Sequence, residues 1–237
     1  MQRYDFYLLP LPFNLFKCID AMKMKSLYLF LLISLWGAVS TAAWAQSPDF
    51  TTWTALGFEY QLKPALSLSG GLEYRSKNDL HTTDRWGLDV GIGYKLASWL
   101  KVGAIYEVHY RDRGSDGWKF RHRYGAQATL STRVQCWKLS LRERVQNTTD
   151  GKKDEIRLRS RVKVAYDLPK CKLEPYISVE MYNGLNRGDD FDVTRMRYRG
   201  GFTFPLFSRW TAELFYLRQW ESDERRNVVG VECVYSF

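Results

Sequence analysis

The chain has 237 residues, a net charge of +9, 16% aromatic residues and a mean hydropathy of -0.38. So many rings with so little overall hydrophobicity argue against a helical membrane protein and suit a β-barrel, whose strands are apolar on one face only. A basic chain can also bind nucleic acid, anionic lipid or acidic ligands, so the placement of the charges has to decide among these classes.

The N-terminal segment has the pattern of an export signal. Two lysines precede the apolar run Leu27 to Val39, and small residues follow it as far as Ala45. This order predicts a secretory signal peptide over residues 22–45, with cleavage after Ala45; an uncleaved anchor is the alternative, although the run is short for a membrane span. Residues 1–21 are then interpreted as an over-extended gene call. Without the first 45 residues, which carry four basic and two acidic side chains, the net charge is +7.

Alternation of apolar and polar residues dominates the rest of the chain. From Arg85 to Leu96, every second residue beginning with Trp86 is apolar, and the residues between are charged or glycine. The same period of two recurs in Lys119–Leu130, Glu155–Tyr166, Lys172–Tyr182 and Asn227–Phe237. This period predicts β-strands with one apolar face. Their length exceeds the roughly five or six residues of ordinary strands and matches the roughly 9–11 residues of a membrane strand.

The connections and the aromatic residues support the same interpretation. Short or apolar turns alternate with longer polar loops, as in outer-membrane barrels with periplasmic turns. Three tryptophans adjoin the long loops (Trp86, Trp118, Trp220) and three adjoin the short turns (Trp99, Trp137, Trp210). Two rings of aromatic residues at the strand ends are typical of the two interfaces of a membrane. Aromatic clusters in a soluble β core are the alternative.

These patterns predict an all-β fold for residues 46–237, an antiparallel, transmembrane, up-and-down β-barrel in the bacterial outer membrane. The segments suggest roughly eleven strands, but single-chain bacterial barrels have even numbers, so we expect 10 or 12, with one strand split or missed near Phe50–Leu62. The C-terminal residues Tyr235 and Phe237 resemble the signal read by the barrel-assembly machinery. Two faults stand out: Glu143 falls on an apolar face, and Trp210–Trp220 alternates poorly, which suggests a bulge.

The polar face is rich in cations. The candidate lumen-lining residues are Arg85, Lys101, Arg121, Arg123, Arg157, Arg159, Arg161, Arg195, Arg197 and Arg199, with Glu107 and Glu180. The first interpretation is a lumen largely plugged by arginine–carboxylate pairs, because side chains fill small barrels. The alternative is a narrow, porin-like channel for anions or acidic oligosaccharides. Expected partners are therefore outer-membrane lipid, the barrel-assembly machinery and an anionic solute. Nucleic acid is not expected, since the basic residues are spread around a wall.

A third alternative, an outer-membrane lipid-modifying enzyme, has little support. The three histidines (His81, His109 and His122) lack an accompanying serine motif, and no metal-ligand spacing or phosphate-binding loop is present. We therefore predict no catalytic, cofactor-binding or metal-binding residue and no enzymatic activity. Cys136, Cys171 and Cys233 are expected to be free thiols.

Alternation alone does not distinguish inside from outside. A soluble β-sandwich or a periplasmic lipid-binding barrel would hold the apolar residues inside and the arginines outside. The aromatic rings and the terminal Phe237 favour the membrane arrangement.

Three stretches resemble one known family. They are Trp53–Tyr60 with the following Leu66-Ser67-Leu68, Glu174–Glu180, and Arg195–Gly201 running into Trp210–Tyr216. Together they resemble the bacterial family catalogued as domain of unknown function 2490, over most of residues 50–237. The resemblance implies an outer-membrane barrel frequent in Gram-negative bacteria of the Bacteroidetes type, and it brings no established activity or catalytic residues.

Overall fold

The computed structural model describes residues 49–149, 154–185, 192–221 and 224–237. The predicted signal peptide and the segment before it lie outside these ranges. The chain divides into two compact units, one of residues 46–168 and 172–237, the other of residues 1–45 and 169–171. The first unit is the barrel. Of the second unit, the structure describes only residues 169–171, which connect β7 to β8.

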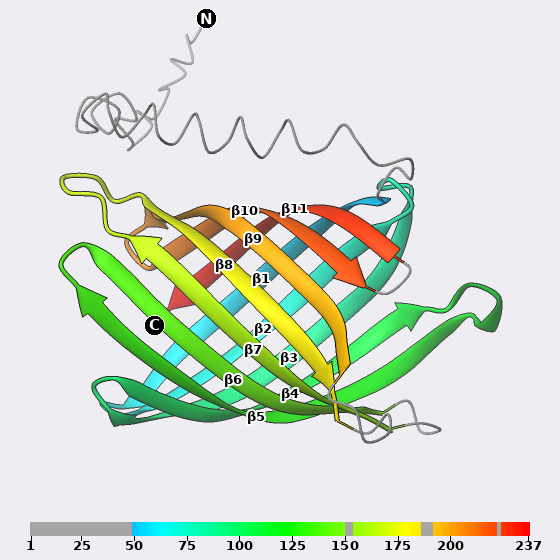
Figure 1. Ribbon diagram of the computed structural model, residues 1–237, viewed down its shortest axis with the longest axis horizontal. Coiled ribbons are helices and arrows are strands. Elements are labelled where there is room, and N and C mark those ends of the chain that lie inside the picture. Colours follow the sequence, from blue (N-terminus) through cyan, green and yellow to red (C-terminus); the bar gives the residue numbers. More distant parts are fainter. Residues whose placement is uncertain (1–48, 150–153, 186–191, 222–223) are drawn as a thin grey trace, which may run out of the picture. The chain divides into compact units, whose positions relative to one another are not determined.

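The described residues form eleven β-strands and one short 3-10 helix, Gly114–Asp116 (Figure 1). The strands are β1 (Asp49–Lys63), β2 (Leu66–Lys77), β3 (Thr82–Ala97), β4 (Leu100–Asp112), β5 (Trp118–Val134), β6 (Trp137–Thr149), β7 (Asp154–Tyr166), β8 (Glu174–Gly184), β9 (Asp192–Phe207), β10 (Trp210–Glu221) and β11 (Glu224–Ser236). In the described part of the chain, no helix is long and apolar enough to cross a membrane.

The sheet closes on itself through a parallel pair of strands. Each strand pairs antiparallel with its neighbours in the chain, whereas β1 and β11 run parallel from Asp49↔Arg226 to Glu59↔Ser236. In an up-and-down barrel, antiparallel closure requires an even number of strands, whereas parallel closure requires an odd number. The barrel has eleven described strands and closes in parallel, so the prediction of 10 or 12 strands is wrong. The segment near Phe50–Leu62, where a further strand was expected, is the single 15-residue strand β1.

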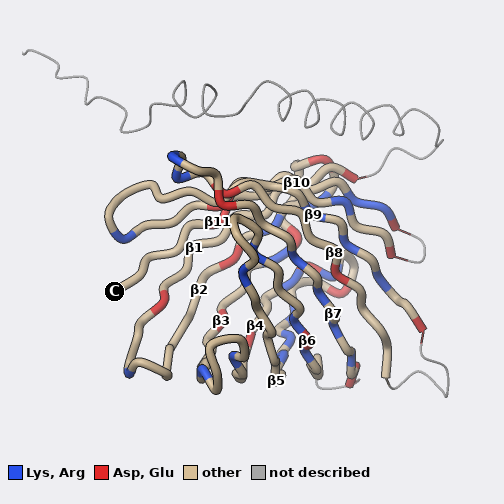
Figure 2. Tube along the Cα trace, turned by 60° about the vertical axis from the view of Figure 1, so that its left-hand side comes forward, with Lys and Arg blue, Asp and Glu red and all other residues tan. Residues whose placement is uncertain are grey.

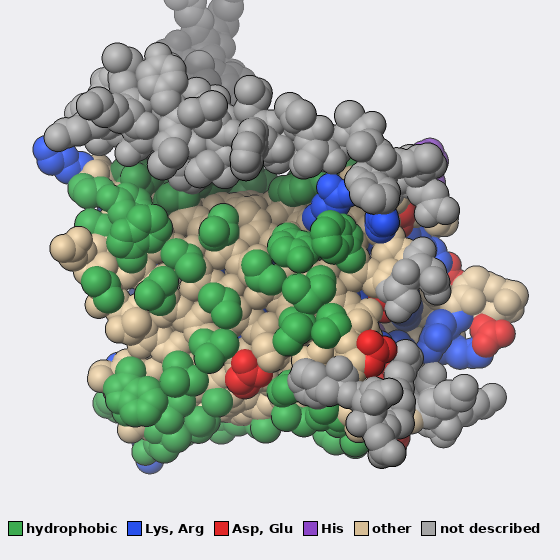
Figure 3. All heavy atoms as spheres, in the orientation of Figure 1, with side chains coloured by type: hydrophobic (Ala, Val, Ile, Leu, Met, Phe, Trp, Pro, Cys, Tyr) green, Lys and Arg blue, Asp and Glu red, His purple; other side chains and the backbone are tan. Residues whose placement is uncertain are grey.

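The apolar face of the strands points outward. On β3 the outward residues Leu88, Val90 and Ile92 are 59%, 53% and 47% exposed, whereas inward residues such as Arg144 and Arg159 are buried. Figure 3 shows hydrophobic side chains spread over the side of the barrel. The alternative arrangement, with the apolar residues inside and the arginines outside, is therefore wrong for this chain.

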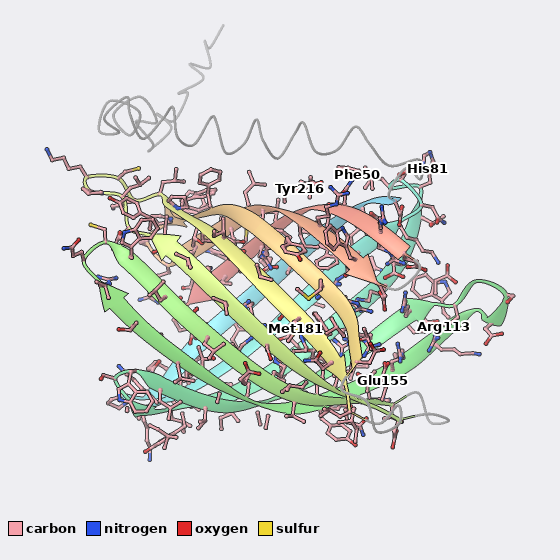
Figure 4. The ribbon with its side chains drawn as sticks, viewed as in Figure 1. Phe50, His81, Arg113, Glu155, Met181 and Tyr216 are labelled. Carbon is pink, nitrogen blue, oxygen red and sulfur yellow. The ribbon has the colours of Figure 1, made fainter. Side chains whose placement is uncertain are left out.

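Aromatic side chains gather at both rims of the barrel. At the rim with the longer connections, Tyr74 contacts Trp86 with ring centroids 4.8 Å apart, and Tyr198 contacts Trp220 at 5.2 Å. Phe50, His81, Arg113 and Glu155 lie toward this rim, which we call the loop rim (Figure 4). At the opposite turn rim, the close pairs are Trp137–Tyr166, Trp210–Tyr235 and Tyr235–Phe237.

The poor alternation of β10 reflects apolar residues that face the lumen. Phe215 and Leu217 are 3% and 2% exposed and form an internal apolar cluster with Trp53, Ala165, Tyr176 and Val228. β10 stays in register with both neighbours from Thr211 to Glu221, and its register shift lies only between Trp210 and Thr211. The irregular pattern is thus an exchange of polar for apolar lumen residues, and the bulge is confined to the end of the strand.

Two further expectations concern single side chains. Glu143 lies on the apolar side of β6, as its sequence position suggested, and accepts a hydrogen bond from Ser160 Oγ at 2.6 Å. Cys136 and Cys233 are free, but Cys171 is disulfide-bonded, so the prediction of three free thiols is wrong at that position. Because Cys136 is free, no bridge joins Cys136 to Cys171.

The packing of Phe215 against Gly230 gives a first test of the barrel interior. A Cβ atom at Gly230 would lie 2.0 Å from Phe215 Cζ, and Arg199 stacks on the same ring, with its Cζ 3.5 Å from the centroid. We expect Gly230→Ala to lower the free energy of unfolding by about 1–3 kcal/mol, because overpacking displaces the ring. Denaturant unfolding would measure this, and the double variant Gly230→Ala with Phe215→Leu should recover part of the loss. Additive losses would contradict the contact.

Candidate functional site

The lumen contains a charged cavity of about 300 Å³. Its lining includes eleven arginines but only five carboxylates, Glu73, Asp89, Glu107, Glu180 and Glu232. The alternation of each strand turns these side chains inward, and closure of the barrel brings them together from both halves of the chain. Basic residues recur along β7 and its neighbours (Figure 2). With all these groups ionised, the lining has a surplus of six positive charges.

Ten of the twelve candidate lumen residues line this cavity: Arg85, Arg123, Arg157, Arg159, Arg161, Arg195, Arg197, Arg199, Glu107 and Glu180. Lys101 does not line it, and its Nζ lies 3.3 Å from Glu59 Oε1 near the turn rim. Arg121 is also outside the cavity lining and lies one inward position closer to the loop rim than Arg123 on β5. Tyr235 and Phe237 lie together at the turn rim.

Glu180 on β8 is the centre of one ion-pair group. Arg159 Nη2 donates to Glu180 Oε1 at 3.0 Å and Oε2 at 3.2 Å, and Arg142 Nη2 donates to Oε1 at 2.9 Å. Arg197 Nη1 lies 3.6 Å from Oε2, and the Tyr182 hydroxyl donates to Oε2 at 2.9 Å. One carboxylate thus holds three guanidinium groups contributed by β6, β7 and β9.

Glu107 on β4 is the centre of the second group. Arg123 Nη1 donates to Glu107 Oε2 at 2.6 Å, and Arg144 Nη1 donates to Oε1 at 3.2 Å. His109 Nε2 lies 3.0 Å from Oε2, so the histidine near Glu107 takes part in a structural ion-pair group. Arg144 also donates to Gln127 Oε1 at 2.7 Å. Each group thus ties neighbouring strands of the wall to a shared carboxylate, β4 to β6 around Glu107 and β6 to β9 around Glu180.

Aromatic rings carry part of the arginine surplus. Arg75 Cζ lies 3.5 Å from the Trp53 ring centroid, and Arg197 Cζ lies 4.9 Å from the rings of both Trp53 and Tyr182. Cations over aromatic faces are stabilised most where water is excluded. Trp53 and Tyr182 therefore add cation–π contacts to guanidinium groups that also lie near Glu73 and Glu180.

A second cavity, of about 360 Å³, adjoins the first on the side of the loop rim. The two share Trp53, Arg75, Arg85, Arg195 and Arg197 in their linings. The second also includes Glu224 and Arg226 from the start of β11. A charged path thus leads from the loop rim to the centre of the lumen.

Some site residues escaped the sequence analysis. Trp53 and Arg75 belong to β1 and β2, where glycine and serine weaken the alternation, and a tryptophan is ordinarily assigned to the apolar face. The pairing of β2 with the regular strand β3, at Arg75↔Arg85, places Arg75 on the inward face. The described residues contain no group of three or more His, Cys, Asp or Glu side chains that could hold a metal ion.

The comparisons with known proteins give a family and two similar solved chains. No curated protein matches the sequence. One similar solved chain, described as "Unveiling the Mechanism Behind the in-meso Crystallization of Membrane Proteins", has 14% identity and a TM-score of 0.39 and covers 78% of this chain and 81% of its own. Another, the translocator domain of autotransporter NalP from Neisseria meningitidis, has 13% identity and a TM-score of 0.36, with coverages of 68% and 70%. A family described as "Protein of unknown function (DUF2490)" matches residues 50–229, and the chain belongs to this family.

Proposed function

We propose that the protein is a β-barrel of the bacterial outer membrane. The observation that carries this proposal is the outward apolar surface between two aromatic rims, around a charged interior. In water such a surface would be an extensive exposed apolar patch, whereas in a bilayer it meets lipid. Its partners would be outer-membrane lipid and the barrel-assembly machinery, which would read Tyr235 and Phe237.

We further propose that the lumen is largely closed by its own side chains. The shared carboxylates Glu107 and Glu180 join arginines from several strands, and the two lumen cavities have volumes of only about 300 and 360 Å³. A lattice of arginines joined through shared carboxylates leaves little room for bulk solute. The role would then be binding or scaffolding, without catalysis and without nucleic acid.

A narrow channel for anions or acidic oligosaccharides is the second candidate. The surplus of arginine over carboxylate in the lumen supports it, because a positive wall attracts anions and repels cations. The charged path from the loop rim would be its outer vestibule.

Single-channel conductance in a planar bilayer would distinguish the two candidates. The purified protein is first shown to be folded by its heat-dependent gel mobility. We expect no discrete conductance steps, because the ion-pair lattice closes the lumen. Steps whose reversal potential in a salt gradient shows anion selectivity would contradict closure and establish the channel. Failure of the protein to fold in any bilayer or detergent would contradict the membrane barrel itself.

A further inference from the structure

Four arginines form a compact square on the lumen wall. The register places Arg142 of β6 directly opposite Arg161 of β7, and Arg144 directly opposite Arg159. All four line the central cavity. Like charges directly opposite each other on paired strands are destabilising, since their Cβ atoms are only about 4.5–5.5 Å apart. A protein that keeps two such pairs side by side needs negative charge in front of them.

The two carboxylates nearest these arginines do not supply enough negative charge to balance them. Glu180 serves Arg142 and Arg159 but also Arg197, and Glu107 serves Arg144 but also Arg123. Six guanidinium groups, including Arg161, therefore face these two carboxylates. Arg161 makes no hydrogen bond or ion pair within the described part of the chain, and its buried Nε has no partner.

Other buried donors of the same arginines also lack acceptors. The Nε atoms of Arg142 and Arg159 are also buried without a hydrogen-bond partner. Buried donors normally have partners, because a buried donor without one has lost its hydrogen bonds to water and gained none in return. Three unpaired donors thus come from one square of arginines. Because guanidinium groups present a planar fork of N–H donors, the matching ligand is an oxyanion with several acceptor oxygens.

We propose that the arginine square, Arg142, Arg144, Arg159 and Arg161, binds a phosphate or sulfate group, free or as an ester, that enters from the loop rim. The multiple negative charge of these groups would offset part of the surplus, and the cavity of about 300 Å³ holds an oxyanion with a small substituent. The shared lining of Arg75, Arg85 and Arg195 would guide the anion inward. This proposal deepens the proposed function by assigning an occupant to the lumen. It depends on a folded barrel with an accessible loop rim and does not depend on conductance.

Titration calorimetry on the folded protein in detergent micelles tests the proposal. The probes are sodium phosphate, sodium sulfate and glucose 6-phosphate, with glucose as the neutral comparison. We expect saturable binding of the anions and none of glucose. Arg161→Gln should weaken binding about tenfold or more, because it removes charge-assisted hydrogen bonds without breaking an ion pair, and Arg161→Lys should lose less.

Arg121→Gln is the matched control. Arg121 also faces the lumen without a hydrogen bond or ion pair in the described residues, but it lies outside the cavity lining. Its substitution should leave binding unchanged. Binding of glucose 6-phosphate as well as phosphate would assign the site to esters such as lipid or sugar headgroups, and binding of phosphate or sulfate alone would assign it to the free anion. Absence of anion binding by protein with native gel mobility, or equal losses in the Arg161 and Arg121 variants, would overturn the site while leaving the barrel proposal intact.

Discussion

Glu180→Gln is expected to lower the free energy of unfolding by about 3–5 kcal/mol, the cost of removing one partner from a buried ion pair. Glu180 is 7% exposed and neutralises Arg142, Arg159 and Arg197 together. Glutamine keeps the volume but removes the charge, so three guanidinium groups remain close together without their shared anion. Denaturant unfolding of the protein in lipid vesicles, followed by gel mobility, would measure the loss.

Glu224→Gln is the control for this effect. Glu224 lies at the loop rim, its side chain is 59% exposed, and its Oε2 lies 2.6 Å from Arg226 Nη2. An exposed pair contributes only about 0–1 kcal/mol, so this variant should be nearly as stable as the parent. If both substitutions cost the same, the Glu180 group does not hold the lumen together.

Val90→Arg is expected to block assembly of the barrel in the membrane. Val90 lies at the middle of β3 with its side chain on the outer face and 53% exposed. An arginine at the lipid face near the midplane costs about 2–4 kcal/mol in a transmembrane barrel. We expect the variant to be depleted from the outer-membrane fraction and to lose the heat-dependent shift in gel mobility.

The same residue on the opposite face should be tolerated. Ser69 on β2 faces the lumen and pairs in register with Glu59 and Gly91. In Ser69→Arg, the new guanidinium can lie beside Glu59 and lumen water, so assembly should match that of the parent. If Ser69→Arg is the more harmful substitution, the outer face does not contact lipid.

The facing of the strands could be predicted because one rule, a period of two, holds over most of the chain. In regular strands such as β3 and β7, the alternation shows which residues face the lumen. The register of strand pairing then fixes which residues of the neighbouring strands face the same way. The rule fails where the lumen itself is apolar. Phe215 and Leu217 broke the pattern of β10 because they form an apolar cluster with Trp53 and Val228 inside the barrel. Sequence alone does not reveal that β1 closes the barrel beside β11 and so brings Trp53 close to β10.

The ion pairs between individual side chains could not be predicted from the sequence either, because they depend on strand register and on the curvature of the barrel. Alternation places Arg161 and Arg142 on the polar face, but only the register shows that they are directly opposite each other. Arg123 and Glu107 come from adjacent strands and could have been paired by a hairpin alignment. Arg144 and Glu107 are two strands apart, and their contact depends on the curvature of the closed wall.

The parallel closure has a consequence for the direction of the polypeptide. β1 and β11 both run from the loop rim to the turn rim, so the chain enters the barrel at one mouth and leaves it at the other. In a barrel with an even number of strands, the first strand begins and the last strand ends at the same rim. In the proposed membrane barrel, the start of β1 and the end of β11 would therefore face opposite sides of the bilayer.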